Sequence, residues 1–272
     1  MAEEIYFTDV KLINQTILNK YNVDFSGMAS TSYRRRLLKA MNLNGVATVN
    51  TLVQKLEESD TFFRKFCSDL TVESTEFFRD PSFWRKLKEE VFPRYASTHS
   101  LRIWLAGCAS GEELYSLCIA LKEQGLLGKA KIIATEITEL SFSRVRAGQY
   151  PLKNMEIALS NYGRFEGKAK LTDYYKEENG NAVFDQSLLN GVVFKALHFG
   201  KEDIASSFDI VLTRNNFIYV NSALQDAALS IIQKSLFKGG FLAIGIKEDI
   251  SNSFDYHHFT AISQEERIFV KK

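Results

Sequence analysis

The residues whose types and spacing could support chemistry are concentrated in one run, from Arg102 to Tyr115. Its sequence is RIWLAGCASGEELY. An apolar segment, Ile103–Ala106, leads into a turn that contains Gly107 and Gly111, and a helix-like apolar run follows. A strand, a glycine turn and a helix in this order let the backbone approach a nucleotide-like cofactor closely.

Two acidic residues at the start of that helix indicate which cofactor the loop suits. Glu112 and Glu113 stand where a pyrophosphate would need a positive helix start. The Gly-x-x-x-Gly spacing also departs from the dinucleotide-binding pattern. We therefore expect a cofactor that presents hydroxyls and an amino group, such as S-adenosylmethionine.

Polar side chains also follow two other apolar, strand-like runs. Glu136 comes after the run 131–135, where nucleotide-binding α/β folds place an acid on the ribose hydroxyls. An ordinary helix start is the alternative interpretation of this residue. Arg214 and Asn215 follow a second run, and Tyr219 lies four residues further on. Ligands of open α/β sheets bind outside the carboxyl ends of strands, so we expect these residues to share one site.

The elements that must position these residues change in kind along the chain. Residues 1–90 show helical spacing of apolar side chains and predict a helical domain. From residue 91 to 272, strands alternate with helices, which predicts an α/β fold with a doubly wound, mainly parallel sheet. The expected strands are 102–106, 131–135, 192–197, 208–213 and 241–245; the expected helices are 82–90, 112–123, 140–147 and 224–236.

One polar segment interrupts this alternation. The interval 151–191 contains Glu177-Glu-Asn-Gly-Asn181, a turn signal between two short strands, and predicts a small antiparallel β-insertion. Lys238-Gly239-Gly240 predicts a helix stop and a turn before the last expected strand.

Composition narrows the class of protein. The 272 residues are 45% hydrophobic and 25% charged, with a net charge of +1, which is typical of a globular domain and gives no reason to expect nucleic acid as a partner. The odd number of cysteines, the absence of a Cys-x-x-Cys pair and the absence of a signal peptide point to the cytoplasm. No run is long enough for membrane insertion, and no metal-ligand spacing is present.

One basic cluster has two interpretations. Arg34, Arg35 and Arg36 stand together on an expected helix. They could form a solvated helix face, or a surface on which an acidic partner helix docks.

Several motifs, in order, resemble those of the chemotaxis receptor glutamate O-methyltransferases, the CheR family. They are STEFFRDP at 74–81, RIWLAGCASGEELYS at 102–116, IIATEI at 132–137, RAGQY at 146–150, FDIVLTRNNFIY at 208–219 and KGGFLAIG at 238–245.

The resemblance implies a helical N-terminal domain, a class I methyltransferase domain and a β-insertion. It implies S-adenosylmethionine as the methyl donor, with S-adenosylhomocysteine as the product, and glutamates on the cytoplasmic helices of a chemoreceptor as acceptors. A receptor C-terminal peptide could add to an edge strand of the insertion. Arg79 and Tyr219 would flank the transferred methyl, and the basic helix would contact the receptor. Cofactor contacts would fall on Glu73, Thr75, Arg79, Gly107, Glu112, Glu136, His198, Phe199, Arg214 and Asn215.

This sequence departs from the family pattern mainly on the adenosine side. Glu73 and the pair His198-Phe199 replace an Asn and an Asn-Leu pair, and Glu136 replaces an Asp. Two alternatives therefore stay open: a catalytically weak, cofactor-binding regulatory module of the same fold, and a methyltransferase for another substrate.

Overall fold

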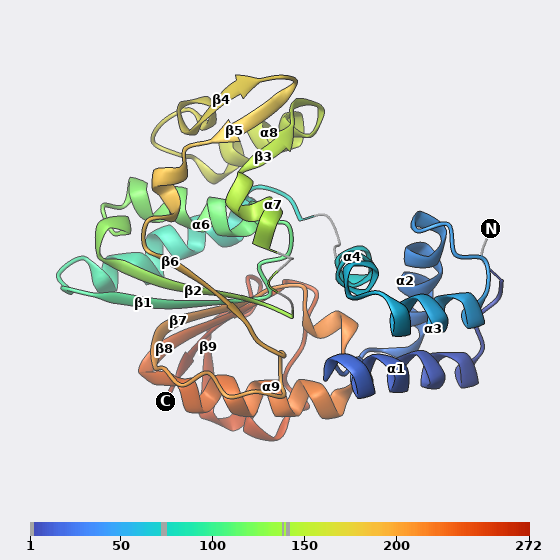
Figure 1. Cartoon of the computed structure of the whole chain (residues 1–272). Helices are drawn as coiled ribbons and strands as arrows, with labels where there is room; N and C mark the ends of the chain where they lie inside the picture. Colours follow the sequence, from blue (N-terminus) through green and yellow to red (C-terminus); the bar gives the residue numbers. More distant parts are fainter. Residues whose placement is uncertain (1–2, 72–74, 138, 140–141) are drawn as a thin grey trace.

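The computed structural model describes residues 3–71, 75–137, 139 and 142–272. Among the described residues, five α-helices come before the first strand, and the other α-helices are distributed among the strands (Figure 1). The α-helices of the described residues are α1 (Phe7–Tyr21), α2 (Ser30–Leu43), α3 (Val49–Glu58), α4 (Asp60–Thr71), α5 (Pro81–Lys86), α6 (Glu112–Glu123), α7 (Phe142–Ala147), α8 (Met155–Phe165) and α9 (Ser222–Ser235).

The main sheet contains seven strands among the described residues, in the order β6-β2-β1-β7-β8-β10-β9. Strands β6, β2, β1, β7 and β8 pair in parallel, and β10 is antiparallel to both of its neighbours. The predicted doubly wound, mainly parallel sheet is therefore confirmed. The strands are β1 (Leu101–Ala106), β2 (Ala130–Glu136), β3 (Gln149–Pro151), β4 (Tyr175–Glu178), β5 (Asn181–Phe184), β6 (Val192–Ala196), β7 (Phe208–Thr213), β8 (Leu236–Ile244), β9 (Phe259–Ser263) and β10 (Ile268–Lys271).

Both faces of the main sheet are covered, because its central strands carry apolar residues on each side. Alternate residues of β1 enter different cores: Ile103 and Leu105 pack with α5 and α6, whereas Trp104 packs with α9. Figure 1 shows α6 and α7 on one side of the sheet and α9 on the other. This layering leaves the carboxyl ends of the parallel strands accessible for a ligand.

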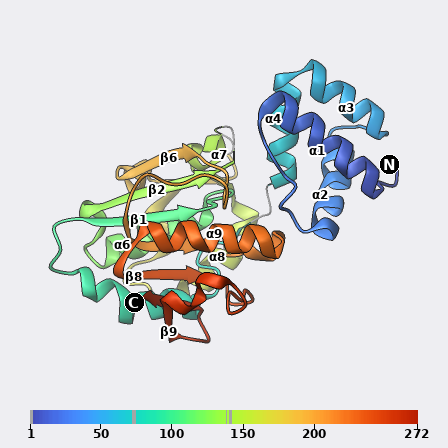
Figure 2. The same cartoon turned by 90° about the horizontal axis from the view of Figure 1, so that it is seen from below.

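The helices α1–α4 bury a core of their own, which includes Ile13, Leu37, Leu52 and Phe66. They stand beside the sheet rather than over it (Figures 1 and 2). Helix α5 packs with the core of the sheet instead. The division into domains at residue 90 stays a prediction. No helix among the described residues is both long and apolar enough to cross a membrane.

The insertion contains the expected hairpin. Strands β4 and β5 are antiparallel and meet at Asn179 and Gly180, both with positive φ, and β3 completes the three-stranded sheet. Two left-handed residues in a row are the geometry of the tight hairpin turn that Asn-Gly favours. The insertion also contains α8, whose apolar residues Met155, Ala158, Tyr162 and Phe165 repeat at helical spacing but were not recognised as a helix.

Two parts of the C-terminal region differ from the expectations. Lys238-Gly239-Gly240 lies inside β8 rather than before it. Helix α9 ends at Ser235, and the turn-like residues are accommodated as an irregularity in the pairing of β8 with β7, with φ of +77° at Gly239. The short strands β9 and β10 were not predicted.

Candidate functional site

A pocket opens at the carboxyl ends of β1, β2 and β7, and the segments after these strands form its walls. Its empty volume is about 1230 Å³ when the solvent at its open mouth is included. The lining residues are Asp24, Phe25, Met28, Arg36, Thr75, Glu76, Arg79, Gly107, Ala109, Glu113, Thr135, Glu136, Ile137, Leu197, His198, Phe199, Lys201, Arg214, Asn215, Asn216, Tyr219, Val220 and Leu224.

The glycine loop after β1 packs closely against the loop after β7. Gly107 has a φ of +83°, and a Cβ atom there would lie 2.6 Å from the side-chain nitrogen of Asn216. That side chain donates a hydrogen bond to the carbonyl of Ala106 at 2.6 Å. The loop after β7 therefore supports the loop after β1, and any larger residue than glycine would separate them.

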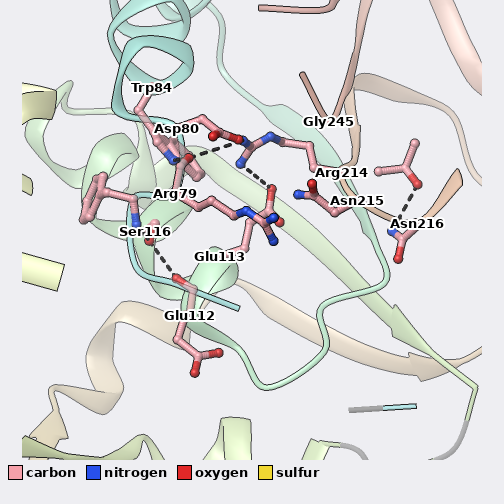
Figure 3. A network of polar contacts seen from close by, with 12 residues as sticks. Arg79, Asp80, Trp84, Glu112, Glu113, Ser116, Arg214, Asn215, Asn216 and Gly245 are labelled. Carbon is pink, nitrogen blue, oxygen red and sulfur yellow. Dashed lines mark hydrogen bonds and ion pairs between the residues drawn. The ribbon is translucent and has the colours of Figure 1, made fainter. Parts of the chain in front are cut away.

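The two acids at the start of α6 face different ways. Glu112, predicted as a cofactor contact, is not among the pocket-lining residues: its carboxylate accepts hydrogen bonds from the hydroxyls of Thr75 and Ser110. Figure 3 shows the Glu112 carboxylate turned away from Arg79 and Arg214. Glu113 faces the pocket in its place, because adjacent helical residues point about 100° apart. Thr75 itself lines the pocket, as predicted for a contact residue.

Arg214 is buried, and its side chain connects three segments of the chain (Figure 3). Its guanidinium pairs with Glu113 at 3.2 Å and with Asp80 at 2.6 Å, and it also donates to the carbonyl of Arg79 at 3.2 Å. It stacks over the Phe83 ring at 4.0 Å. Since the guanidinium is already paired with two carboxylates, Arg214 holds the start of α5 and the start of α6 to the end of β7.

The backbone around Arg79 is strained in a way that fixes its direction. Phe78 and Asp80, on either side of it, have φ values of +50° and +57°. Left-handed non-glycine residues cost free energy and are retained where the surrounding structure holds them, often at functional sites. The carbonyl of Arg79 is held by the Trp84 indole N–H at 3.0 Å. The side chain of Arg79 lines the pocket next to Glu113.

Burial raises the pKa of Glu113, and the neighbouring Arg214 and Arg79 oppose that rise.

Glu136 lies at the end of β2 with its carboxylate in the pocket wall. The backbone N–H of Ala109 donates to it at 2.6 Å, so this carboxylate also holds the glycine loop. Burial raises the pKa of Glu136, while backbone hydrogen bonds and Arg36 lower it. An acceptor in this position has the chemistry needed for a ribose diol.

His198 and Phe199 line the pocket after β6, together with Leu197. Burial lowers the pKa of His198, which favours the neutral imidazole. The Phe199 ring contacts Phe217 edge to face. Glu73, the remaining predicted contact, lies outside the described residues.

Tyr219 contacts the group of helices α1–α4, which we call the helical unit, at the site. The Arg36 guanidinium lies over the Tyr219 ring, 4.0 Å from its centroid, and both residues line the pocket. The basic cluster is therefore divided: Arg36 is buried, Arg35 is exposed, and Arg34 is partly exposed, 3.9 Å from Glu4. Three consecutive helical residues cannot share one face. That Arg36 would line the pocket was not predicted.

A further residue with a clear positioning role, Glu248, was not among the predicted site residues. It is 2% exposed. Its carboxylate accepts backbone hydrogen bonds from Gly245 at 2.6 Å, Asn215 at 2.9 Å and Ile218 at 3.2 Å. Asn215 has a φ of +59°, so this carboxylate stabilises the turn that carries Asn215 and Tyr219.

The profile described as CheR methyltransferase, SAM binding domain, matches residues 73–267. The chain belongs to the CheR methyltransferase family. A Pseudomonas putida protein with the provisional name methyltransferase Cher3 is 34% identical over 97% of this chain and 96% of its own length. Chemotaxis protein methyltransferases of Listeria monocytogenes and Pseudomonas aeruginosa are 27% and 30% identical, over 93% and 84% of this chain and 92% and 85% of their own lengths.

Among solved structures, the N-methyltransferase NodS of Bradyrhizobium japonicum in complex with S-adenosylhomocysteine aligns with a TM-score of 0.38 and 12% identity. The alignment covers 71% of this chain and 88% of that chain.

Family membership makes this chain an S-adenosylmethionine-dependent methyltransferase. The pocket fits that cofactor: Glu136 offers a carboxylate, and Leu197 and Phe199 offer apolar surface. Which residues contact the cofactor stays a prediction. The predicted residues that line the pocket are Thr75, Arg79, Gly107, Glu136, His198, Phe199, Arg214 and Asn215.

The position of Glu248 leads to a testable expectation. In Glu248→Gln, an amide N–H would face backbone N–H groups, leaving buried donors unsatisfied at a cost of about 1–3 kcal/mol. We expect a lower melting temperature and weaker binding of S-adenosylhomocysteine, measured by thermal unfolding and calorimetry. Glu265→Gln, at an exposed position, is the matched control. Unchanged affinity in Glu248→Gln would contradict the positioning role.

Proposed function

We propose that this protein transfers the methyl group of S-adenosylmethionine to glutamate side-chain carboxylates on the cytoplasmic helices of a chemoreceptor, producing glutamyl methyl esters. The observation that carries the proposal is the grouping of Arg79, Tyr219 and Arg36 around one pocket of a CheR-family chain. Relatives that align over most of their length bear the name chemotaxis protein methyltransferase.

A carboxylate acceptor needs no general base for methyl transfer. A glutamate side chain has a pKa of about 4.3 in water and is already anionic at neutral pH. The task left to the protein is to bind this anion, orient one of its oxygens and exclude water. The Arg36 guanidinium lies over the Tyr219 ring, and Arg79 lines the same pocket, so each offers a positive group to such an acceptor.

Each residue then has a distinct proposed role. When bound, S-adenosylmethionine supplies an electrophilic methyl on a sulfonium. Glu136 would hold its ribose hydroxyls. Arg79 would hold one oxygen of the acceptor carboxylate by a charge-assisted hydrogen bond and leave the other oxygen to attack, and Tyr219 would line the methyl path. Arg214 would act indirectly, by fixing Arg79 and Glu113 through the contacts described above.

The test is a transfer assay with methyl-labelled donor and membranes that contain chemoreceptors. We expect label in the receptor that is released as volatile methanol by mild base, since carboxyl methyl esters are base-labile. A receptor whose candidate glutamates are replaced by alanine is the control and should take up no label.

Two outcomes would overturn the proposal in different ways. Binding of S-adenosylhomocysteine without transfer to any receptor would identify a regulatory module. Base-stable label, or label in another class of molecule, would identify a different acceptor.

A further inference from the structure

The segment between α1 and α2 forms part of the cofactor pocket, although it lies outside the 73–267 match. We call residues 24–29 the strap. Three of them, Asp24, Phe25 and Met28, line the pocket beside residues that follow β6 and β7. Like Arg36 of α2, the strap thus brings residues of the helical unit to a site built mainly on the sheet.

Backbone hydrogen bonds fasten the strap to the segment that carries Tyr219. The N–H of Ala29 donates to the carbonyl of Tyr219 at 2.7 Å, and the N–H of Asn221 donates to the carbonyl of Gly27 at 2.8 Å. Between these two bonds, Met28 and Val220 form an antiparallel bridge. The strap therefore pairs with the 219–221 segment like a very short β-strand.

An ion pair fastens the other end of the strap. The Lys201 ammonium binds the Asp24 carboxylate and also donates to the Asp24 carbonyl at 3.1 Å. Burial raises the pKa of Asp24, but Lys201 and Ser26 outweigh this effect and lower it to about 2. This ion pair therefore persists throughout the neutral range.

The strap also approaches α9 closely. A Cβ atom on Gly27 would lie 2.4 Å from a methyl carbon of Leu224, which itself lines the pocket. The strap thus touches the pocket wall directly, and a cofactor that fills the pocket lies between the strap and the carboxyl ends of the strands.

The polar contacts that fasten the strap to the 219–221 segment and to Lys201 are few. Two backbone hydrogen bonds at one end and a partly exposed ion pair at the other each contribute modestly. A methyltransferase must exchange product for donor after every transfer, and lids of this kind open on the microsecond to millisecond timescale.

We propose that Phe25 and Met28 contact the bound cofactor and that the strap is the lid through which the methyl donor enters and the product leaves. The proposal rests on the cofactor occupying this pocket, and it is independent of the acceptor. It assigns the helical unit a role in donor exchange.

A disulfide across the bridge tests the lid directly. Met28 and Val220 are a non-hydrogen-bonded antiparallel pair, because the two bonds involve their neighbours. Such pairs have a Cα separation of about 4.5 Å, within the range of about 4.4–6.8 Å that disulfides span. The native Cys67, Cys108 and Cys118 are all buried.

In the variant Met28→Cys/Val220→Cys, we expect oxidation to slow association and dissociation of S-adenosylhomocysteine by at least about tenfold. Product loaded before oxidation should survive gel filtration, and reduction should restore the wild-type rates. Met28→Cys alone, treated with the same oxidant, is the control. If the oxidised double variant exchanges product at the rate of the reduced form, the lid does not exist.

A second variant gives an answer even if the disulfide forms incompletely. Lys201→Met removes the ion pair, and we expect dissociation of S-adenosylhomocysteine to become roughly two- to fivefold faster, the effect of losing a partly exposed pair. Lys234→Met, on an exposed position of α9, is the control. An unchanged dissociation rate in Lys201→Met would contradict the proposal. Both experiments measure S-adenosylhomocysteine exchange without a methyl acceptor. A failure of receptor methylation, which would overturn the proposed function, would therefore not affect either result.

Discussion

Replacement of Arg79 by alanine is expected to lower the rate of methyl transfer at saturating donor by roughly 30- to 1000-fold. This corresponds to about 2–4 kcal/mol of lost transition-state stabilisation. The expected loss is large because Arg79 is held in place before any ligand binds. Its neighbours Phe78 and Asp80 adopt left-handed backbone conformations, and its carbonyl is held by Trp84 and Arg214.

The Arg79 experiment needs both a graded variant and a control. Arg79→Lys keeps the charge but not the planar fork, so it should recover only part of the rate. Arg85→Ala, on α5, is the control because its side chain contacts the carbonyl of Arg164, away from the pocket. The rate is measured with labelled donor and receptor membranes, and the affinity for S-adenosylhomocysteine separately. A wild-type rate in Arg79→Ala would exclude the proposed role.

Much of this site could be predicted from the sequence, because a parallel sheet brings the carboxyl ends of its strands together. Glu136, Arg214 and Asn215 each follow an apolar run, and that position alone predicted that they meet. Gly107 could be recognised because its position requires a conformation and a closeness that only glycine allows.

The parts that were missed depend on rotation and on long-range packing. Whether Glu112 or Glu113 faces the pocket depends on how α6 is turned about its axis, and both residues were acceptable from spacing alone. Arg36 and the strap meet Tyr219 across nearly 200 residues of sequence, through a β-bridge that involves one residue on each side. No local pattern encodes a contact of that kind. In the same way, the buried partners of Glu248 are backbone N–H groups, which leave no mark on the sequence.

Donor affinity should depend most strongly on Glu136. Its carboxylate lies in the pocket wall and also holds the glycine loop through Ala109. Glu136→Gln removes the charge that strengthens hydrogen bonds to a diol, and it also places an amide N–H where a backbone N–H donates. We expect a loss of about 2–3 kcal/mol in binding, roughly a 30- to 150-fold rise in the Kd for S-adenosylhomocysteine measured by calorimetry.

The pH dependence of that affinity separates an electrostatic role of Glu136 from a merely structural one. Burial raises the pKa of Glu136 above its ordinary value, so the residue takes up a proton at a higher pH than an exposed glutamate does. Since the charged form is the better acceptor for hydroxyls, affinity should fall as the pH is lowered through the range in which Glu136 takes up its proton. In Glu136→Gln this part of the pH dependence should disappear, whereas Glu139→Gln, at an exposed position just beyond β2, should keep both the affinity and the slope. An affinity in Glu136→Gln that matches the wild type at every pH would show that the ribose is held elsewhere.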